Sequence, residues 1–128
     1  MQMLVRNPTA NIYPATPDYV HAMEVRNPGR LLFVSGTMGL DPDGRAAGTL
    51  DAQLALIWSN LTTILADAGM STDDIVRVTS YLRDVAYVEA NQNARLVALG
   101  GRAVPTTAIV VQTLSEAWLV EIEIIAAG

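Results

Sequence analysis

The sequence predicts an α+β fold in which two helices pack on one face of a mixed β-sheet. Two segments with a helical period, 50–68 and 86–99, are separated by a β-branched segment at 75–83. Strand-like segments come before and after this middle part, which gives the order ββ–α–β–α–ββ. No linker or low-complexity stretch divides the chain, so we expect one domain over residues 1–128.

The first two strands are predicted at 19–25 (YVHAMEV) and 31–36 (LLFVSG). The segment between them contains Pro28 and Gly29, which suit the two central positions of a type II turn. This arrangement predicts an antiparallel pair at the start of the sheet. The DPDG segment at 41–44 predicts another turn before the first helix.

The first helix is predicted from Leu50 to Ala68, because its apolar residues recur at the i, i+3, i+4, i+7 spacing. Gly69 follows and suits the left-handed position after a helix C-terminus. The indole of Trp58 is expected in the core. The apolar face comprises Leu54, Ile57, Trp58, Leu61, Ile64, Leu65 and Ala68.

The second half of the chain is predicted to hold three strands and one helix. Ser71 followed by Asp74 is a capping-box signal for a single helical turn. Gly100 and Gly101 are expected to end the second helix. The predicted elements are a strand at 75–83, a helix at 86–99, and two strands at 106–114 and 118–126.

The last strand carries two carboxylates, Glu121 and Glu123, inside an apolar segment. Alternate residues of a strand face the same way, so both carboxylates share one face of the sheet. In the segments AIVVQ and VEIEIIA, both alternating faces also carry apolar residues. Two helices cover only one face of such a sheet, and we therefore expect a homo-oligomer that covers the other.

The composition argues against several kinds of chemistry. The chain has no cysteine, and all eight of its basic residues are arginines. Thiol catalysis and a Schiff-base lysine are therefore excluded. His21 is the only histidine and lies on a predicted strand, where we interpret it as structural. A zinc site or a catalytic triad with histidine is not expected.

Charge and hydropathy indicate which partners to expect. A net charge of −5 argues against nucleic-acid binding, because that binding depends on neutralising phosphates. No apolar segment approaches the ~18 residues that a membrane-spanning helix needs, and no signal peptide is recognised. We expect no membrane anchor. The absence of cysteine fits a cytoplasmic protein.

Several segments together carry a family resemblance. They are LLFVSGTMGLDPDG, NLTTILADAGMSTDDIVRVTSYLRD, Asn91, Pro105 and LVEIEIIA, in this order and spacing. From about residue 19 to its C-terminus, the chain resembles the RidA/YjgF family, the reactive-intermediate deaminases. The resemblance implies a chorismate-mutase-like fold and a homotrimer whose sheets face inward, with small-molecule clefts between neighbouring subunits. It also implies hydrolysis of 2-imino or 2-enamino acids to 2-keto acids and ammonia, without a metal or a cofactor.

The resemblance also supplies candidate site residues. Glu121 matches the glutamate that holds the attacking water, and is the candidate catalytic residue. Tyr19 matches a tyrosine that lines the cleft. Ser35 and Gly36 match a Ser-Gly pair at the cleft, and Asn91 matches an asparagine at the start of the second helix. We expect these four residues to contact the ligand.

Thr107 marks the main departure from the family. Two residues after the proline that matches Pro105, the family has an arginine that clamps the substrate carboxylate bidentately. Here that residue is Thr107, whose hydroxyl can hydrogen-bond a neutral ligand but cannot replace the guanidinium group. We therefore predict negligible activity on 2-iminobutanoate-type substrates. Arg102, in a glycine-flanked loop, is a candidate replacement, and the alternative is a solvated loop arginine.

Each candidate also has a structural interpretation. Glu121 is then paired with backbone donors or with a partner's arginine in the trimer. Tyr19 is a core lid, Ser35 and Gly36 allow a close backbone approach, and Asn91 bonds a loop.

Three functions follow from these observations. The leading hypothesis is a trimer in which Glu121 activates water to hydrolyse an imine, an enamine or a related C–N bond. The second is a non-catalytic small-molecule-binding or regulatory trimer. The third is an endoribonuclease or translation inhibitor, against which the acidic charge and the absence of lysine argue.

Overall fold

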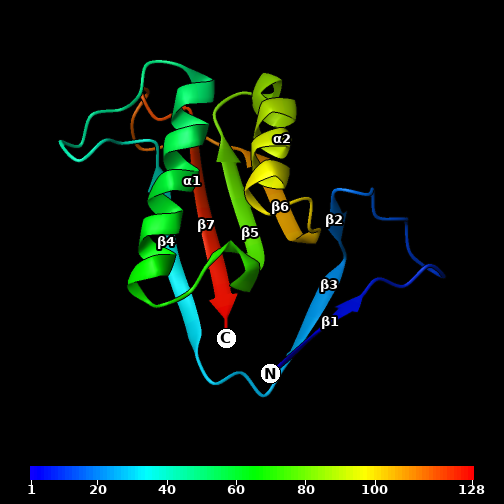
Figure 1. Ribbon diagram of the computed structural model, residues 1–128. Coiled ribbons are helices and arrows are strands. Elements are labelled where there is room, and N and C mark those ends of the chain that lie inside the picture. The colour runs from blue at the N-terminus through cyan, green and yellow to red at the C-terminus, as the bar shows by residue number, and fades with distance from the viewer.

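The computed structural model describes residues 1–128 as a mixed sheet with two helices on one face (Figure 1). The sheet has five strands in the order β2-β6-β5-β7-β4. Strands β2 and β5 run parallel to β6, whereas β4 and β5 run antiparallel to β7. The strands are β2 (Tyr19–Val20), β4 (Leu31–Met38), β5 (Ile75–Leu82), β6 (Val104–Val110) and β7 (Val120–Ala127).

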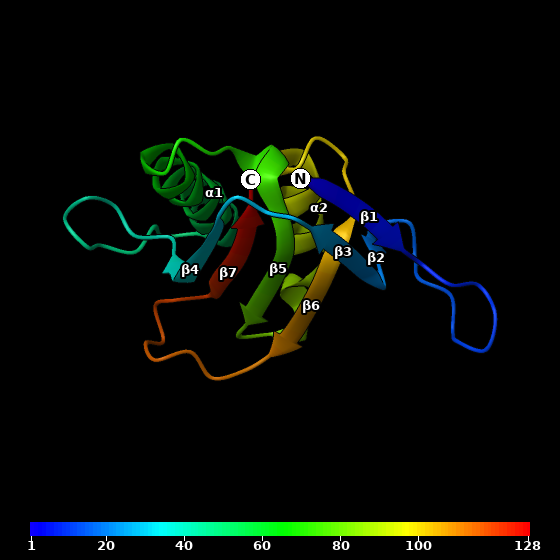
Figure 2. The same ribbon diagram turned by 90° about the horizontal axis from the view of Figure 1, so that it is seen from below.

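Both helices lie on the same side of this sheet, and the other side is open (Figure 2). They are α1 (Leu50–Asp67) and α2 (Val88–Ala98). A cluster of 16 buried apolar residues fills the space between the helices and the sheet, and the fully buried Ile57, Leu61 and Leu65 of α1 belong to it. The predicted class, with two helices on one face of a mixed sheet, is confirmed.

The ends of helix α1 form as the sequence predicts. Thr49 caps its start, because its side chain accepts a hydrogen bond from the amide of Ala52. Gly69 has φ of 67° and directs its amide to the carbonyl of Ala66, which ends the helix in a left-handed turn. The capping box of Ser71 and Asp74 is also present, in the short 3₁₀ helix Thr72–Asp74.

The start of the chain differs from the prediction. The strand expected at 19–25 is interrupted at His21, whose amide donates to Asn7 Oδ1. Its second part, β3 (Ala22–Arg26), pairs antiparallel with β1 (Gln2–Arg6), a strand that the sequence did not predict. The predicted antiparallel pair of the first two strands is therefore wrong, because β4 pairs with β7 instead.

One predicted turn and one predicted strand end differ in the structure, whereas a second turn forms as predicted. The left-handed residue between β3 and β4 is Asn27, with φ of 52°. Gly29 has no positive φ, so the prediction of a type II turn at Pro28-Gly29 is wrong. The DPDG turn is confirmed, with Gly44 at φ of 78°. Strand β6 ends at Val110, four residues before the predicted end. Arg83 donates to the Thr113 carbonyl and draws that segment into a loop.

Neither α1 nor α2 combines the length and the hydropathy that a membrane-spanning helix requires.

Candidate functional site

The two glutamates of β7 lie on the open face of the sheet. Val120, Ile122 and Ile124 alternate with them and are 0–1% exposed beneath the helices, whereas Glu121 and Glu123 are half-buried. The period of two therefore places both carboxylates on the face that neither helix covers (Figure 2). The prediction that they share one face is confirmed.

The Glu121 side chain lies directly over the backbone of Gly36. A Cβ atom placed on Gly36 would lie 2.8 Å from Glu121 Cδ and 3.0 Å from Oε2. Only glycine leaves room for the carboxyl group in this position. The register of β4 with β7 shifts between Val34 and Thr37, so Gly36 lies in a bulge next to the carboxylate. Exposed Ser35 precedes it in the chain.

Ser35 and Gly36 belong to a shallow hollow at the edge of the sheet. Gly36 and Met38 line it from β4, and Asn60 and Thr63 line it from helix α1. Glu121 does not line this hollow, and of the Ser-Gly pair only Gly36 lies directly against its side chain. The backbone of Gly36 closely approaches the Glu121 side chain, as the structural interpretation of this glycine predicts.

Glu123 has a partner inside the chain. The Tyr81 hydroxyl on β5 donates a hydrogen bond to Glu123 Oε1. This bond, together with desolvation and the nearby carboxylate charges, raises the pKa of the Tyr81 phenol above its ordinary value. Glu123 is therefore held by a neutral donor. Glu121 forms no ion pair and no side-chain hydrogen bond with another residue of the chain.

Thr107 lies beside a guanidinium group that sequence reasoning missed. Arg77 on β5 donates from Nη2 to Thr107 Oγ1 at 2.8 Å. Thr79 pairs with Thr107 on one side and with Glu123 on the other, so these polar residues form a row across three strands. An arginine inside a β-branched strand requires a partner. The presence of Arg77 in such a strand was therefore the sequence signal that could have predicted a polar contact here.

Arg77 and Glu123 also line one cavity. It has a volume of about 220 Å³ and includes Thr79 and the aromatic ring of Phe33. A cationic, an anionic and an apolar side chain therefore meet on the open face of the sheet.

Tyr19 and Asn91 lie at a different place. Together with Thr106 they line a second cavity of about 220 Å³ next to helix α2. Thr106 alternates with Thr107 on β6, so this cavity is on the opposite face from Glu121. Asn91 is 3% exposed, and its Oδ1 atom has no hydrogen-bond partner. The structure thus brings Tyr19 and Asn91 together, but away from Glu121 in the same chain.

An ion pair between buried Arg95 and half-buried Asp18 forms one wall of this second cavity, and the sequence did not predict it. Arg95 of α2 is 3% exposed and donates from Nη2 to Asp18 Oδ2 at 2.8 Å. Burial alone would raise the pKa of the Asp18 carboxyl, but hydrogen bonds from Thr16 and Arg95 outweigh it and lower that pKa. The pair fixes the chain just before Tyr19.

Arg102 and His21 have structural roles. Arg102 donates from Nη2 to the carbonyl oxygens of Thr72 at 2.9 Å and Ile75 at 2.8 Å. It is therefore neither solvated nor free to replace the missing arginine, and both expectations for Arg102 are wrong. His21 Nε2 lies 2.9 Å from the Tyr13 carbonyl oxygen, and the ring packs edge-on against Tyr13 and Tyr19, as a structural histidine does.

The chain contains no group of three or more histidine, cysteine, aspartate or glutamate side chains that could hold a metal ion. The polar groups on the open face are two carboxylates, which accept hydrogen bonds, together with hydroxyls and one guanidinium, which donate them. They can hold a water molecule or a polar ligand by hydrogen bonds and charge.

Two helices on one face of a mixed sheet, with a carboxylate over a glycine on the open face, define an α+β protein with a polar, uncovered sheet face. The family model described as endoribonuclease L-PSP matches residues 9–128. The chain therefore belongs to this family, which is the family of the RidA/YjgF proteins.

Individual relatives agree with this family. A RutC family protein of Pyrococcus abyssi is 32% identical over 111 residues, which are 84% of each chain. A RutC family protein of Aquifex aeolicus is 34% identical over 63% of this chain and 62% of its own length, less than two thirds. The crystal structure of the Rid family protein YyfB of Yersinia pestis, described as of unknown function, has a TM-score of 0.85 at 29% identity over 100% of both chains.

Proposed function

We propose that the chain forms a homotrimer of single-domain subunits through the open face of its sheet. Phe33 pairs with Ile125 and is 70% exposed, and Ile109 pairs with Tyr81 and is 46% exposed. Both side chains therefore belong to the face that carries Glu121. Exposed apolar residues of this size on an uncovered sheet favour association with further copies of the chain.

In this trimer, small-molecule clefts lie between neighbouring subunits, and Glu121 is the general base of a hydrolysis. One observation carries this proposal: Glu121 lies over Gly36 without a basic partner in the chain. A half-buried carboxylate without a partner is costly, so it is kept either for a partner across the interface or for use at a site.

The reaction is the hydrolysis of an imine, an enamine or a related C–N bond. Glu121 accepts a proton from a water molecule while the water oxygen attacks the imine carbon. The resulting carbinolamine takes up a proton at nitrogen, breaks its C–N bond and releases ammonia and a carbonyl compound. One imine and one water molecule are thus converted to one carbonyl compound and one ammonia. The reaction requires no metal or cofactor.

The substrate class follows from Thr107. A neutral hydroxyl at this position removes the bidentate carboxylate clamp, so the favoured substrates are imines without a carboxylate next to the C–N bond. Arg77, 2.8 Å from Thr107, is the nearest fixed cation and supports a weaker anion contact from the neighbouring strand.

A non-catalytic, ligand-binding or regulatory trimer is the second candidate, and the absence of the clamping arginine favours it. An endoribonuclease, the activity in the family's name, is less favoured, because the chain has net charge −5 and no lysine. A cytoplasmic location fits the cysteine-free sequence.

The test measures ammonia release from two sets of freshly generated imines. Amine oxidation supplies imines without a carboxylate, and amino-acid oxidation supplies 2-imino acids. The proposed enzyme accelerates the first set and has little effect on the second. Saturable binding of the same compounds without ammonia release would favour the non-catalytic trimer. RNA cleavage that disappears in Glu121→Ala would instead establish the ribonuclease.

A further inference from the structure

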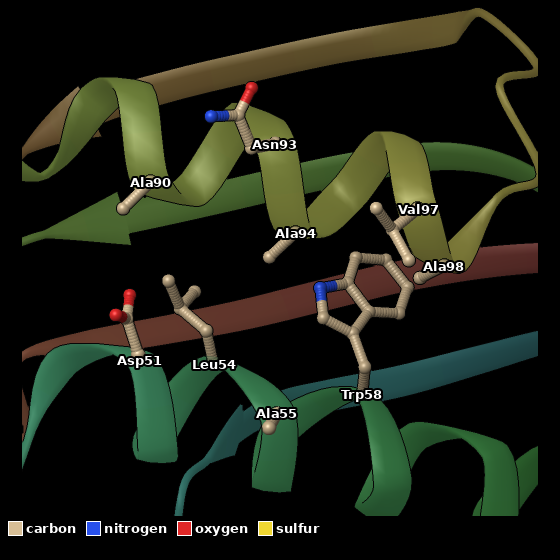
Figure 3. A pocket seen from close by; sticks show the side chains of 9 residues that line it. All are labelled: Asp51, Leu54, Ala55, Trp58, Ala90, Asn93, Ala94, Val97 and Ala98. Carbon is tan, nitrogen blue, oxygen red and sulfur yellow. The ribbon is translucent and has the colours of Figure 1, made fainter.

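A groove between helices α1 and α2 has no role in the function proposed above. It lies on the helix side of the sheet, whereas Glu121 lies on the opposite face (Figure 2). The cavity has a volume of about 510 Å³ and is lined mostly by apolar side chains of both helices (Figure 3). This volume falls within the range that small-molecule sites occupy.

Small residues on α2 create the groove. Ala90, Ala94 and Ala98 follow one another at intervals of four residues, so they share one face of the helix. They face Leu54 and Trp58 of α1 (Figure 3). Because methyl groups cannot reach across to α1, the two helices leave space between them.

Trp58 supplies a polar group that the fold does not use. The residue is 7% exposed, and its indole Nε1–H has no hydrogen-bond partner. Figure 3 shows the indole rising from α1 toward α2, with its nitrogen turned toward the part of the groove between Leu54 and Ala94. A buried tryptophan N–H usually finds a partner, and leaving it unpaired lowers the stability of the fold. A phenylalanine here would bury an aromatic ring without this cost.

A negative charge lies at the other end of the groove. Asp51 is exposed in the first turn of α1 and forms no ion pair or side-chain hydrogen bond in the chain. Trp58 follows Asp51 by seven positions, which corresponds to about 10 Å along the helix axis. The long Trp58 side chain leans toward the helix N-terminus and shortens the gap between the two polar groups.

We propose that this groove binds a small arylalkylamine. The ammonium group of the ligand pairs with Asp51, and its aromatic ring lies against Leu54 and the alanines of α2. An oxygen atom on the far side of the ring accepts the hydrogen bond from Trp58 Nε1–H. Charge complementarity selects the cation, and the unpaired indole N–H selects an acceptor at the opposite end.

The test uses NMR of the two tryptophan indole N–H groups, assigned with Trp58→Phe. The probe is 4-methoxyphenethylamine, which has an ammonium group at one end of a benzene ring and an acceptor oxygen at the other. We expect the Trp58 indole resonance to shift saturably at submillimolar probe concentration, while the Trp118 resonance stays in place. 4-Ethylanisole, which lacks the amine, is expected to bind at least about threefold more weakly.

Matched variants locate the probe. Asp51→Asn is expected to weaken binding about threefold to fivefold, whereas Asp67→Asn, an exposed acid at the far end of the same helix, leaves it unchanged. Ala94→Leu fills the groove and is expected to weaken binding at least tenfold. Where Ala94→Leu fails to fold, Ala55→Leu on the exposed opposite wall replaces it.

Several results would overturn the proposal. They are an unmoved Trp58 resonance, a folded leucine variant with unchanged binding, or equal binding of the amine and 4-ethylanisole. A Trp58 resonance that shifts with protein concentration alone would show that a second copy of the chain occupies the groove. Glu121→Gln is expected to bind the probe normally, which separates this site from the function proposed for the open face.

Discussion

Gly36→Ala should damage the function of Glu121 without damaging the fold. The new methyl carbon would lie 2.8 Å from Glu121 Cδ, whereas ordinary contacts begin at 3.4 Å. The carboxyl group must therefore move by at least about 0.6 Å. Displacing a catalytic group by about 1 Å can cost roughly a hundredfold in rate. We expect turnover of a responsive imine to fall by about one to two orders of magnitude.

The stability of the same variant should change little. Gly36 does not have a positive φ, so alanine can adopt its backbone conformation. The flexible Glu121 side chain can rotate away, and the loss of glycine's freedom in the unfolded chain favours the variant by about 0.4–1 kcal/mol. Urea unfolding should place the free energy of unfolding within about 1 kcal/mol of the wild type.

Gly48→Ala is the matched control, because no atom lies within 4 Å of the added methyl group and Gly48 has no positive φ. It should leave turnover and stability unchanged. Wild-type turnover in Gly36→Ala would show that the position of the Glu121 carboxyl group over Gly36 does not matter for catalysis. A destabilisation of more than about 2 kcal/mol would instead attribute the lost activity to unfolding.

Three further predictions concern the open face. Light scattering should give three times the chain mass of 13.7 kDa. Phe33→Asp should shift the protein toward monomer, because it places a charge on the exposed apolar face. A wild-type monomer at micromolar concentration would contradict the trimer. The hydrogen bond to Glu123 raises the pKa of the Tyr81 phenol above its ordinary value of 10.0. The stabilisation that this hydrogen bond gives the folded state is therefore complete below pH 10 and is lost as the pH rises through the raised pKa. Urea unfolding should therefore show a steeper alkaline loss for the wild type than for Tyr81→Phe, and parallel profiles would be evidence against this. Thr107→Arg should raise turnover of 2-imino acids by about a hundredfold. Wild-type turnover within tenfold of that variant would mean that Arg77 already holds the carboxylate, which Arg77→Met would test.

Local patterns predicted the elements that local physics determines. Helix α1 formed where the apolar period required it, and Gly69 ended it because only a left-handed residue fits there. The period of two placed Glu121 and Glu123 on one face, because alternate residues of a strand face the same way. These features depend on residues within a few positions of one another.

Long-range pairing was beyond the sequence pattern. Strand β1 exists because β3 offers it a partner edge, and the sequence of either segment alone does not reveal this. The same holds for the Arg77–Thr107 and Arg95–Asp18 contacts, which join residues 30 and 77 positions apart. Arg102 was misjudged because its acceptors are backbone carbonyls, which no sequence motif marks.

Glu121→Gln separates a catalytic from a structural role of this side chain, because glutamine has nearly the size of glutamate and keeps one acceptor oxygen but cannot accept the proton from water. Turnover of a responsive imine and the stability of the oligomer should be measured on the same preparation. If Glu121 is the general base, turnover should fall by at least about a hundredfold, within the usual range for general-base catalysis, with the stability unchanged. Unchanged turnover and ligand affinity, with stability lowered by more than about 1 kcal/mol, would show that the carboxylate is structural and would contradict the account.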